Sequence, residues 1–370
     1  MFLLAPFRNA RPTAVAAHVL ATAAVIVGAS AAHAGEITDQ RGRAFTLDKP
    51  PHRLIFMPIP APSTFITIDG EAKKIVGMNS YSATAMRDGI MGKIFPGLSH
   101  IKTDVVMNTS DPSSFAPNIE SVLALQPDLI FQWATAADNI EALDRLGIPT
   151  IGLRVSTNDD FVRYVAIMGQ VAGKEQRAAT LLQRQNAERE RLKKEFGALK
   201  PEERPRVLYF NRATNMLRVS GKGTFNDYYI GLAGGRNVAG DTSSMSTVTI
   251  EQVLTWDPQV ILLGNFDDAT PADIYADPRW QSIDAVRNRR VYRMPLGGYR
   301  WDPPSQESAL TWAWLAGLLH PQRDHTDLRA AMRDWYTFLY AHTLTDDEID
   351  AILFMEQNRA SAGYERYSRR

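Results

Sequence analysis

Short runs of consecutive apolar residues recur along the first part of the chain and predict buried strands. The runs are 54–57, 74–78, 129–131 and 150–153. Successive side chains point to opposite faces of a strand, so these strands need cover on both faces, as in a parallel sheet. Helical stretches such as 136–146 fall between the runs, which gives an alternating β/α order.

The same order returns in the second part of the chain. Apolar runs at 206–210, 260–263 and 290–294 alternate with helical stretches at 225–233 and 305–319. The pattern therefore predicts a second α/β lobe. Bilobed proteins usually work in the cleft between their halves, so we expect the ligand there.

A long polar helix is predicted between the two lobes. Residues 161–171 are helical, Gly173 interrupts, and 174–199 form one charged amphipathic helix that Pro201 and Pro205 end. It would be roughly 35–40 Å long. A coiled-coil arm is the alternative, but the chain has no second heptad helix to pair with it. We predict an α/β fold in which a single long α-helix joins two Rossmann-like lobes with central parallel sheets.

Domain limits follow from these elements. They are a signal peptide at 1–34, an N-terminal α/β lobe at 35–158, linking helices at 159–200, a C-terminal α/β lobe at 201–345 and a tail at 346–370. The N-terminal lobe opens with a predicted hairpin at 36–47. We expect the last few residues of the tail to be disordered.

The first segment has the features of a secretory signal peptide. Arg8 and Arg11 precede an alanine- and valine-rich stretch at 14–32, and Ala32-His33-Ala34 has the small-x-small form of a cleavage site. A retained membrane anchor is the alternative. The sequence has no cysteine, which excludes a disulfide, a thiolate metal site and lipid attachment through an N-terminal cysteine. We expect cleavage after Ala34 and a free protein in the periplasm.

The overall composition argues against nucleic acid as a partner. The 370 residues include 41 basic and 41 acidic side chains, so the formal net charge is zero. No global field attracts nucleic acid or an acidic membrane. With 45% hydrophobic residues the chain resembles an ordinary globular protein, and we expect a monomer.

Two segments of twelve residues repeat each other. Residues 119–130 and 250–261 share Ile, Glu, Val, Leu, Pro and Ile, six of the twelve positions. A repeat of this length within one chain indicates a duplicated structural unit.

A glutamate lies at the same place in each copy. Asn118 and Thr249 are good N-caps, which puts Glu120 and Glu251 in the first turn of a helix. The helix dipole favours a carboxylate there by roughly 0.3–1 kcal/mol, which is one sufficient explanation. The functional alternative is a pair of surface acids, one per lobe, that grip arginines on a two-fold partner.

The chain resembles the class III periplasmic substrate-binding proteins of ABC importers, which carry iron–siderophores, haem and cobalamin. The resemblance covers about residues 37–335 and rests on 118–130, its counterpart at 249–261, the long linking helix and Gly147-Ile148-Pro149. It implies that Glu120 and Glu251 dock on arginines of the two permease subunits. It also implies a ligand in the cleft, against loops at the C-terminal ends of strands.

Several candidate ligand-binding residues fall in such loops. They are Tyr81, Arg87, Trp133, Arg212, Met245, Tyr299, Arg300 and Trp301. Segment 297–304 is the most informative, because two glycines, a tyrosine, an arginine, a tryptophan and two prolines crowd together after a strand. Aromatic faces there would lie against a flat or greasy ligand while arginine neutralises anionic oxygens.

Simpler alternatives exist for the same residues. Trp301 would pack over the Pro303-Pro304 turn, and Arg212 would pair with a surface acid. Tyr81 would pack or hydrogen-bond rather than ligate haem iron as a phenolate. The sequence leaves these alternatives open.

Other chemistry is disfavoured. The histidines after residue 34 are scattered without the spacing of a shared metal site, and the sequence lacks the hydrolase, zinc-protease and phosphate-loop motifs. We therefore expect no enzyme, no cofactor and no bound bare metal. The expected function is capture of an iron chelate, a ferric siderophore, for an inner-membrane ABC permease dimer. Haem or cobalamin is the alternative cargo, and a periplasmic hydrolase that uses Asp267-Asp268 is the alternative of another class.

Overall fold

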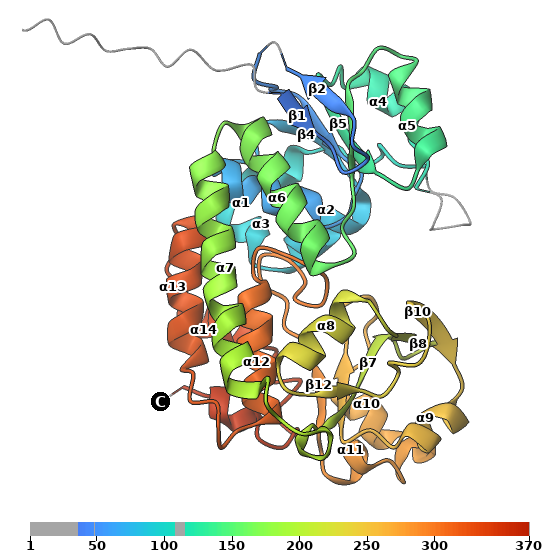
Figure 1. The fold of residues 1–370 in the computed structure, drawn as a ribbon, viewed down its shortest axis with the longest axis vertical. Helices are drawn as coiled ribbons and strands as arrows, with labels where there is room; N and C mark the ends of the chain where they lie inside the picture. Colours follow the sequence, from blue (N-terminus) through green and yellow to red (C-terminus); the bar gives the residue numbers. More distant parts are fainter. Residues whose placement is uncertain (1–35, 48, 108–114, 370) are drawn as a thin grey trace, which may run out of the picture. The chain divides into compact units, whose positions relative to one another are not determined.

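Two α/β lobes lie along a layer of helices in the computed structural model (Figure 1). The structure describes residues 36–47, 49–107 and 115–369, so the predicted signal peptide lies outside the described residues. The α/β prediction is confirmed. The domain limits stay predictions.

The first lobe contains a four-stranded parallel sheet in the order β4-β3-β5-β6. Its strands are β3 (Leu54–Phe56), β4 (Ile75–Met78), β5 (Leu129–Trp133) and β6 (Thr150–Leu153). The predicted hairpin is present as β1 (Glu36–Thr38) and β2 (Ala44–Thr46), which pair antiparallel. Its helices are α1 (Ala61–Asp69), α2 (Ser80–Asp88), α3 (Met91–Ile94), α4 (Ile119–Ala124) and α5 (Ala137–Asp144), with a 3-10 turn, η1 (Pro96–His100).

Tyr81 and Arg87 were expected in a loop but lie in a helix, and the proline-rich residues 58–63 lead into another helix. Residues 58–63 run into α1. Pro60 is its N-cap and Pro62 lies in its first turn, where backbone N–H groups have no partner within the helix and proline is therefore tolerated. Residues 79–87 lie almost entirely in α2, because the Asn79 side chain accepts a hydrogen bond from Tyr81 N at 3.0 Å and caps the helix.

The second lobe has a mixed sheet, not a purely parallel one. Parallel strands β7, β11 and β12 form its core, β9 pairs parallel with β7, and β8 and β10 add an antiparallel extension. The strands are β7 (Arg206–Arg212), β8 (Leu217–Ser220), β9 (Arg236–Asn237), β10 (Met245–Val248), β11 (Val260–Leu263) and β12 (Val291–Arg293). The helices are α8 (Phe225–Leu232), α9 (Ile250–Trp256), α10 (Pro271–Ala276) and α11 (Asp284–Arg287), with the 3-10 turn η3 (Pro278–Trp280).

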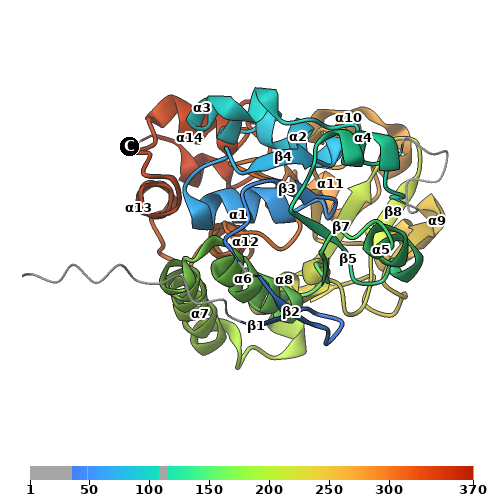
Figure 2. The same ribbon diagram turned by 90° about the horizontal axis from the view of Figure 1, so that it is seen from above.

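A layer of helices connects the lobes (Figure 1), and much of it lies along one side of the molecule in Figure 2. Its members are α6 (Asn158–Ala172), α7 (Glu175–Phe196), α12 (Ser308–Leu319), α13 (Leu328–Tyr340) and α14 (Asp346–Ile352), with the 3-10 turns η2 (Pro201–Glu203) and η4 (Tyr364–Tyr367). The predicted break at Gly173 is confirmed, since this residue is left-handed with φ 63° between α6 and α7. The predicted long helix is α7, at 22 residues. Its Arg177 donates to Thr67 O in the first lobe and to Phe338 O and Leu339 O in α13.

Each sheet is covered on both faces, as the apolar runs predicted. In β3, Leu54 and Phe56 face the large core that includes the linking helices, whereas Ile55 faces a separate small core. In β7, Tyr209 faces the large core and Leu208 faces another one. The large core runs without interruption from one lobe through the helical layer to the other.

The expectation of a disordered tail is wrong for the described residues. Tyr364 and Tyr367 are buried at 1% and 3% exposed, and the Tyr292 hydroxyl donates to Ala362 O at 2.7 Å. Most residues of this stretch are polar, which suggested disorder. A few buried aromatic side chains are nevertheless enough to hold it against the protein.

Candidate functional site

The facing ends of the two lobes meet at one loop, residues 297–302, which we call the interlobe loop. It follows β12 and lies against α2 and α3 of the first lobe. Ile90 N donates to Gly297 O at 3.0 Å, and Arg300 Nη1 donates to Tyr81 O at 3.3 Å. The loop therefore crosses from one lobe to the other at the C-terminal ends of the strands, where open α/β sheets bind their ligands.

Arg300 is the bridging side chain of this loop. Its Nε donates to Asn265 O at 3.0 Å, and its guanidinium carbon lies 4.6 Å from the centroid of the Phe266 ring. The residue is 7% exposed. Arg300 thus donates to two backbone carbonyls, one in each lobe, and its guanidinium stacks on an aromatic ring.

Tyr299 and Trp301, predicted to lie against a ligand, are fully buried. Both are 0% exposed, and both belong to the large core. A direct contact between either ring and a ligand would require the interlobe loop to move. Trp301 packs in the large core, and its hydrogen-bond partner there is a carboxylate.

That partner is Glu307, which is 0% exposed and accepts four hydrogen bonds. Trp301 Nε1 and the Tyr336 hydroxyl each donate to Oε2 at 2.7 Å. Gly298 N donates to Oε1 at 2.9 Å, and the Tyr340 hydroxyl donates to the same oxygen. Burial raises the pKa of Glu307, and the four donors oppose this rise only in part. Burial and the neighbouring carboxylate also raise the pKa of both tyrosines, which stay donors.

The two glycines of the interlobe loop are required by this packing. A Cβ on Gly297 would meet Glu307 Oε2 at 2.0 Å, and a Cβ on Gly298 would meet the Tyr340 hydroxyl at 2.6 Å. The sequence carries one signal for this arrangement. Glu307 directly precedes the mostly apolar stretch 308–319, whose residues are all buried in the structure, so its carboxylate needs partners inside the protein.

A second buried acid holds the other end of the interlobe loop. Asp302 is 1% exposed, and its Oδ2 accepts from the Tyr209 hydroxyl at 2.8 Å and from Asn265 N at 3.0 Å. Its backbone carbonyl accepts from Asn226 Nδ2 at 3.0 Å. Tyr209 had been predicted only as a strand residue. Asp302 and Glu307 together fix the loop that carries Arg300 between them.

Three other predicted residues present atoms to solvent. Tyr81 is 44% exposed in the first turn of α2. Arg87 is exposed near the end of the same helix and donates to Thr84 Oγ1 at 3.3 Å. Arg212 is half-buried and is the last residue of β7, so it belongs to the strand and not to the loop that follows. Its side chain has no partner among the described residues.

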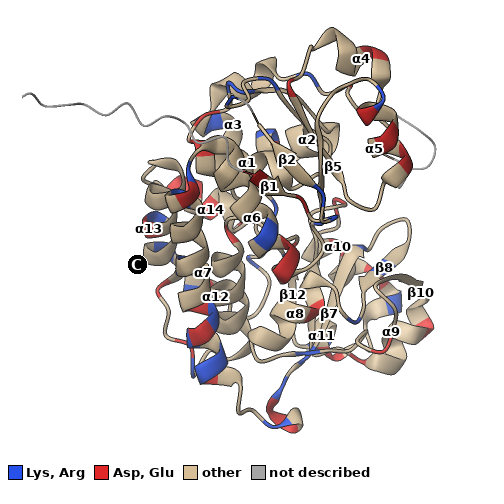
Figure 3. Ribbon diagram, turned by 45° about the horizontal axis from the view of Figure 1, so that its top comes forward, with Lys and Arg blue, Asp and Glu red and all other residues tan. Residues whose placement is uncertain are grey.

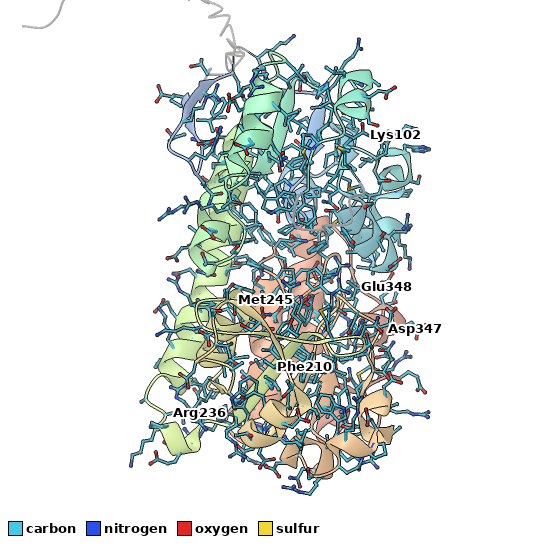
Figure 4. The ribbon with its side chains drawn as sticks, turned by 90° about the vertical axis from the view of Figure 1, so that its right-hand side faces the viewer. Lys102, Phe210, Arg236, Met245, Asp347 and Glu348 are labelled. Atoms are coloured by element: carbon cyan, nitrogen blue, oxygen red, sulfur yellow. The ribbon has the colours of Figure 1, made fainter. Side chains whose placement is uncertain are left out.

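The two remaining candidates lie on strands and not in loops. Met245 is the first residue of β10, half-buried, and its sulfur accepts from Ser220 Oγ at 3.1 Å. Trp133 ends β5 and stacks on Phe115 with ring centroids 4.3 Å apart. These two rings and residues 135–139 line a hollow of about 500 Å³. Figure 4 shows Met245 on the side of the second lobe that is nearer the first, while Arg236 lies at the opposite end.

The repeated segments form matching short helices, α4 and α9, as predicted. Ser121 N donates to Asn118 Oδ1 and Gln252 N donates to Thr249 Oγ1, each at 3.3 Å, so both N-caps are confirmed. Both glutamates of the first turn, at positions 120 and 251, are exposed. Figure 3 marks acidic positions on both helices. The Thr249 side chain lowers the pKa of Glu251, which keeps that carboxylate charged.

Neither a metal cluster nor a membrane span is found in the described part of the chain. No group of three or more His, Asp and Glu side chains is disposed to hold a metal ion within residues 36–47, 49–107 and 115–369. Over the same residues, no helix has the length and apolar content needed to cross a bilayer.

The sequence matches a known family over half of its length. Residues 108–296 match the family described as periplasmic binding protein. The chain belongs to the periplasmic binding protein family. A solved periplasmic solute-binding protein from Veillonella parvula is 31% identical to it, with a TM-score of 0.79, and the match covers 88% of this chain and 98% of that one.

Two further relatives extend the comparison. The molybdate-binding protein MolA of Haemophilus influenzae is 27% identical over 336 residues, which cover 84% of this chain and 92% of that protein. The structure of MolA bound to molybdate has a TM-score of 0.73 at 26% identity and covers 84% of this chain. A cobalamin-binding protein of Halobacterium salinarum is 29% identical over 63% of this chain and 64% of its own length.

Family membership confirms the resemblance to class III periplasmic substrate-binding proteins. This periplasmic binding protein is a substrate-binding component of an ABC transporter, and proteins of its family bind and deliver solutes.

Proposed function

We propose that this periplasmic binding protein captures a metal-containing anion between its lobes, and that this anion is a ferric siderophore. Arg212 carries the proposal. It is a half-buried arginine at the C-terminal end of a central strand, and its charge has no partner among the described residues. A cation held without a counter-ion at the mouth of a sheet suits an anionic ligand, because a charge-assisted hydrogen bond would satisfy it.

The remaining cleft chemistry supports a chelate. Tyr81 presents an exposed ring, and Trp133 with Phe115 presents a stacked pair beside a hollow of about 500 Å³. Ferric siderophores combine apolar or aromatic arms with anionic oxygens, and aromatic faces with arginines match both parts.

A tetrahedral oxyanion such as molybdate is the second candidate. Two observations favour it. Tyr299 and Trp301 are buried and offer no stacking face, and the molybdate-binding relative matches 84% of this chain. A small oxyanion needs donors and not aromatic area, so it would use Arg212 without the aromatic rings.

Titration against a panel decides between these cargoes. The panel contains ferric catecholate, hydroxamate and carboxylate siderophores, haemin, cobalamin and molybdate, and binding is followed by tryptophan fluorescence and calorimetry. We expect a ferric siderophore to bind with a Kd below about 10 µM, which corresponds to about −7 kcal/mol. Submicromolar molybdate binding with no siderophore binding would overturn the first candidate. A Soret band with haemin would identify haem, with Tyr81 as its axial ligand.

We also propose that the chain is exported to the periplasm, cleaved after Ala34 and active as a monomer. Glu120 and Glu251 would then dock on arginines of the two subunits of the inner-membrane permease. The equivalent positions of the two exposed glutamates on capped helices support this. Mass spectrometry of the secreted form tests the cleavage, and an N-terminus other than Gly35 would contradict it.

A further inference from the structure

The two repeated segments are alike in their bonding as well as in their sequence. Position 126 in one copy and position 257 in the other are both left-handed, with φ 46° for Gln126 and 40° for Asp257. In each lobe, an arginine directly before a central strand or at its first position donates hydrogen bonds to this turn. Arg53 Nε donates to Gln126 O at 3.1 Å, and Arg206 Nε donates to Asp257 O at 3.0 Å.

The inward face of each short helix is also the same. Val122 in α4 and Val253 in α9 are both 0% exposed and anchor their helices to the lobe beneath. The buried valines, the N-caps and the hydrogen bonds from the arginines already hold each helix in place. The outward-facing residues are therefore not needed for stability.

An exposed leucine follows each glutamate at the same position. Leu123 is 46% exposed and Leu254 is 37% exposed. Seven large apolar side chains are exposed among the described residues, and these two occupy equivalent places in the repeat. Each leucine lies three residues after its glutamate, so the two side chains share one face of the helix. Each lobe therefore presents the same acid beside the same apolar side chain.

We propose that Leu123 and Leu254 are a matched pair of apolar anchors for the ABC permease. The inference rests on the proposed function, in which Glu120 and Glu251 dock on the two permease subunits. Each leucine would enter an apolar depression beside the arginine that receives the glutamate. Exclusion of water around a charged pair strengthens that pair and keeps the contact specific.

The arrangement on the molecule suits a partner with two equivalent subunits. Figures 1 and 2 both show α4 and α9 on the same side of the two lobes, away from α7. One flat membrane-facing surface would therefore reach both helices at once. A partner with a single site would have no use for the second leucine.

Site-specific photocrosslinking is the first test. A photoreactive phenylalanine analogue is placed at position 123, 254, 120 or 146 of the full chain, and the chain is added to membranes of the source cell. Leu146 is the matched control, since it is 41% exposed in the turn that follows α5 and lies outside the repeat. We expect positions 120, 123 and 254 to crosslink to an integral membrane subunit of an ABC permease, and position 146 to give no such product.

The other outcomes separate the two claims. Crosslinks from position 120 without crosslinks from 123 and 254 would overturn the leucine anchors and leave the docking glutamates standing. An absence of permease crosslinks from all three positions would contradict the proposed docking itself. Crosslinks to a second copy of this chain would overturn the inference, because the surface would then be a self-association face.

Affinity for the permease identified in this way provides the second test. We expect Leu123→Ser and Leu254→Ser each to weaken binding to that permease in lipid nanodiscs about tenfold, which equals about 1.4 kcal/mol. Leu146→Ser should bind as the unaltered protein does. If both leucine variants keep full affinity while Glu120→Lys loses it, the anchors are refuted. Circular dichroism melting checks that the variants stay folded.

Discussion

Trp301 Nε1 donates a hydrogen bond to Glu307 Oε2 at 2.7 Å, and both side chains are fully withdrawn from solvent. This bond ties the interlobe loop to the helical layer. Because Arg300 lies next to Trp301 and contacts Tyr81 O of the first lobe, this contact between the lobes depends on a buried carboxylate. Buried polar groups of this kind fix one arrangement, because every alternative leaves some of them unpaired.

Replacement of this carboxylate should destabilise the protein. In Glu307→Gln the amide nitrogen takes the place of one acceptor oxygen, so about two of the four donors lose their acceptor. An unsatisfied buried donor costs about 1–3 kcal/mol, so we expect the free energy of unfolding to fall by about 2 kcal/mol or more. Urea denaturation measures this. The exposed Glu202→Gln is the control, and an equal midpoint for both variants would refute the role of Glu307.

The glycines of the interlobe loop should be equally sensitive. In Gly297→Ala the new Cβ would meet Glu307 Oε2 at 2.0 Å and the Tyr336 hydroxyl at 2.1 Å, so the loop must shift. We expect a loss of about 2–4 kcal/mol. Gly231→Ala in α8 meets nothing within 4 Å and should stabilise the protein by about 0.5–1 kcal/mol. Thermal melting that ranks the two variants the other way would contradict the packing described for this loop.

Stability in acid should depend on Glu348. Burial alone would raise its pKa, but Lys93 of the first lobe, Thr345 N and His342 lower the pKa of this carboxyl to about 2. The folded pKa lies below the ordinary value of 4.5, so the stabilisation is complete above pH 4.5 and is lost as the pH falls toward 2. Since Lys93 is largely exposed, screening limits the effect to about 1 kcal/mol.

The variant Glu348→Gln should flatten the dependence of unfolding free energy on pH in that window. Glu356→Gln is the control, because the Glu356 side chain is 80% exposed. Urea midpoints measured across the window and at neutral pH provide the comparison. A curve for Glu348→Gln as steep as that of the unaltered protein would show that this carboxyl does not titrate as described.

Ligand affinity should depend on Arg212 and not on arginines elsewhere. Arg212→Ala removes the cation that has no partner within the described part of the chain and that we propose to bind the ligand. Loss of a charge-assisted hydrogen bond costs about 1.5–3 kcal/mol, or about ten- to a hundredfold in Kd. Calorimetry with whichever panel compound binds the unaltered protein measures this. Arg236→Ala is the control, since Arg236 is exposed at the far end of the second lobe in Figure 4. Equal affinities for the two variants would remove Arg212 from the site.

Transport should need both docking glutamates. Reversal of charge in Glu120→Lys with Glu251→Lys should abolish uptake of the cargo into cells and leave its affinity unchanged, because both side chains are exposed on α4 and α9. Uptake of labelled cargo and calorimetry on the same variant separate the two effects. Retained uptake would contradict the docking proposal, and lost affinity would mean that the variant disturbs the cleft.

The local sequence was sufficient for much of the fold. Continuous apolar runs predicted the central strands, since strands covered on both faces leave no polar alternation to confuse the pattern. Asn118, Thr249 and Gly173 marked helix ends correctly, because caps and left-handed residues act through neighbours in the chain. Helices α13 and α2 were missed, since their signals compete with those of turns.

The direction in which the loop side chains point was not predictable in the same way. Tyr299, Arg300 and Trp301 were correctly taken as an unusual loop, yet two of the three point into the core. Which way a loop side chain points is decided by partners far along the chain, such as Tyr336 for the carboxylate that binds Trp301. No local pattern carries that information.

The sequence by itself determined the class of the protein, its two lobes, its long helix and the repeated glutamate. Each depends on periodicity, capping or repetition, which are properties of contiguous residues. Only the tertiary structure decided that Glu307 and Asp302 fix the interlobe loop, that Arg300 bridges the lobes and that Arg212 lacks a partner among the residues described. These facts depend on hydrogen bonds and burial between distant segments, and such contacts exist only once the chain has folded.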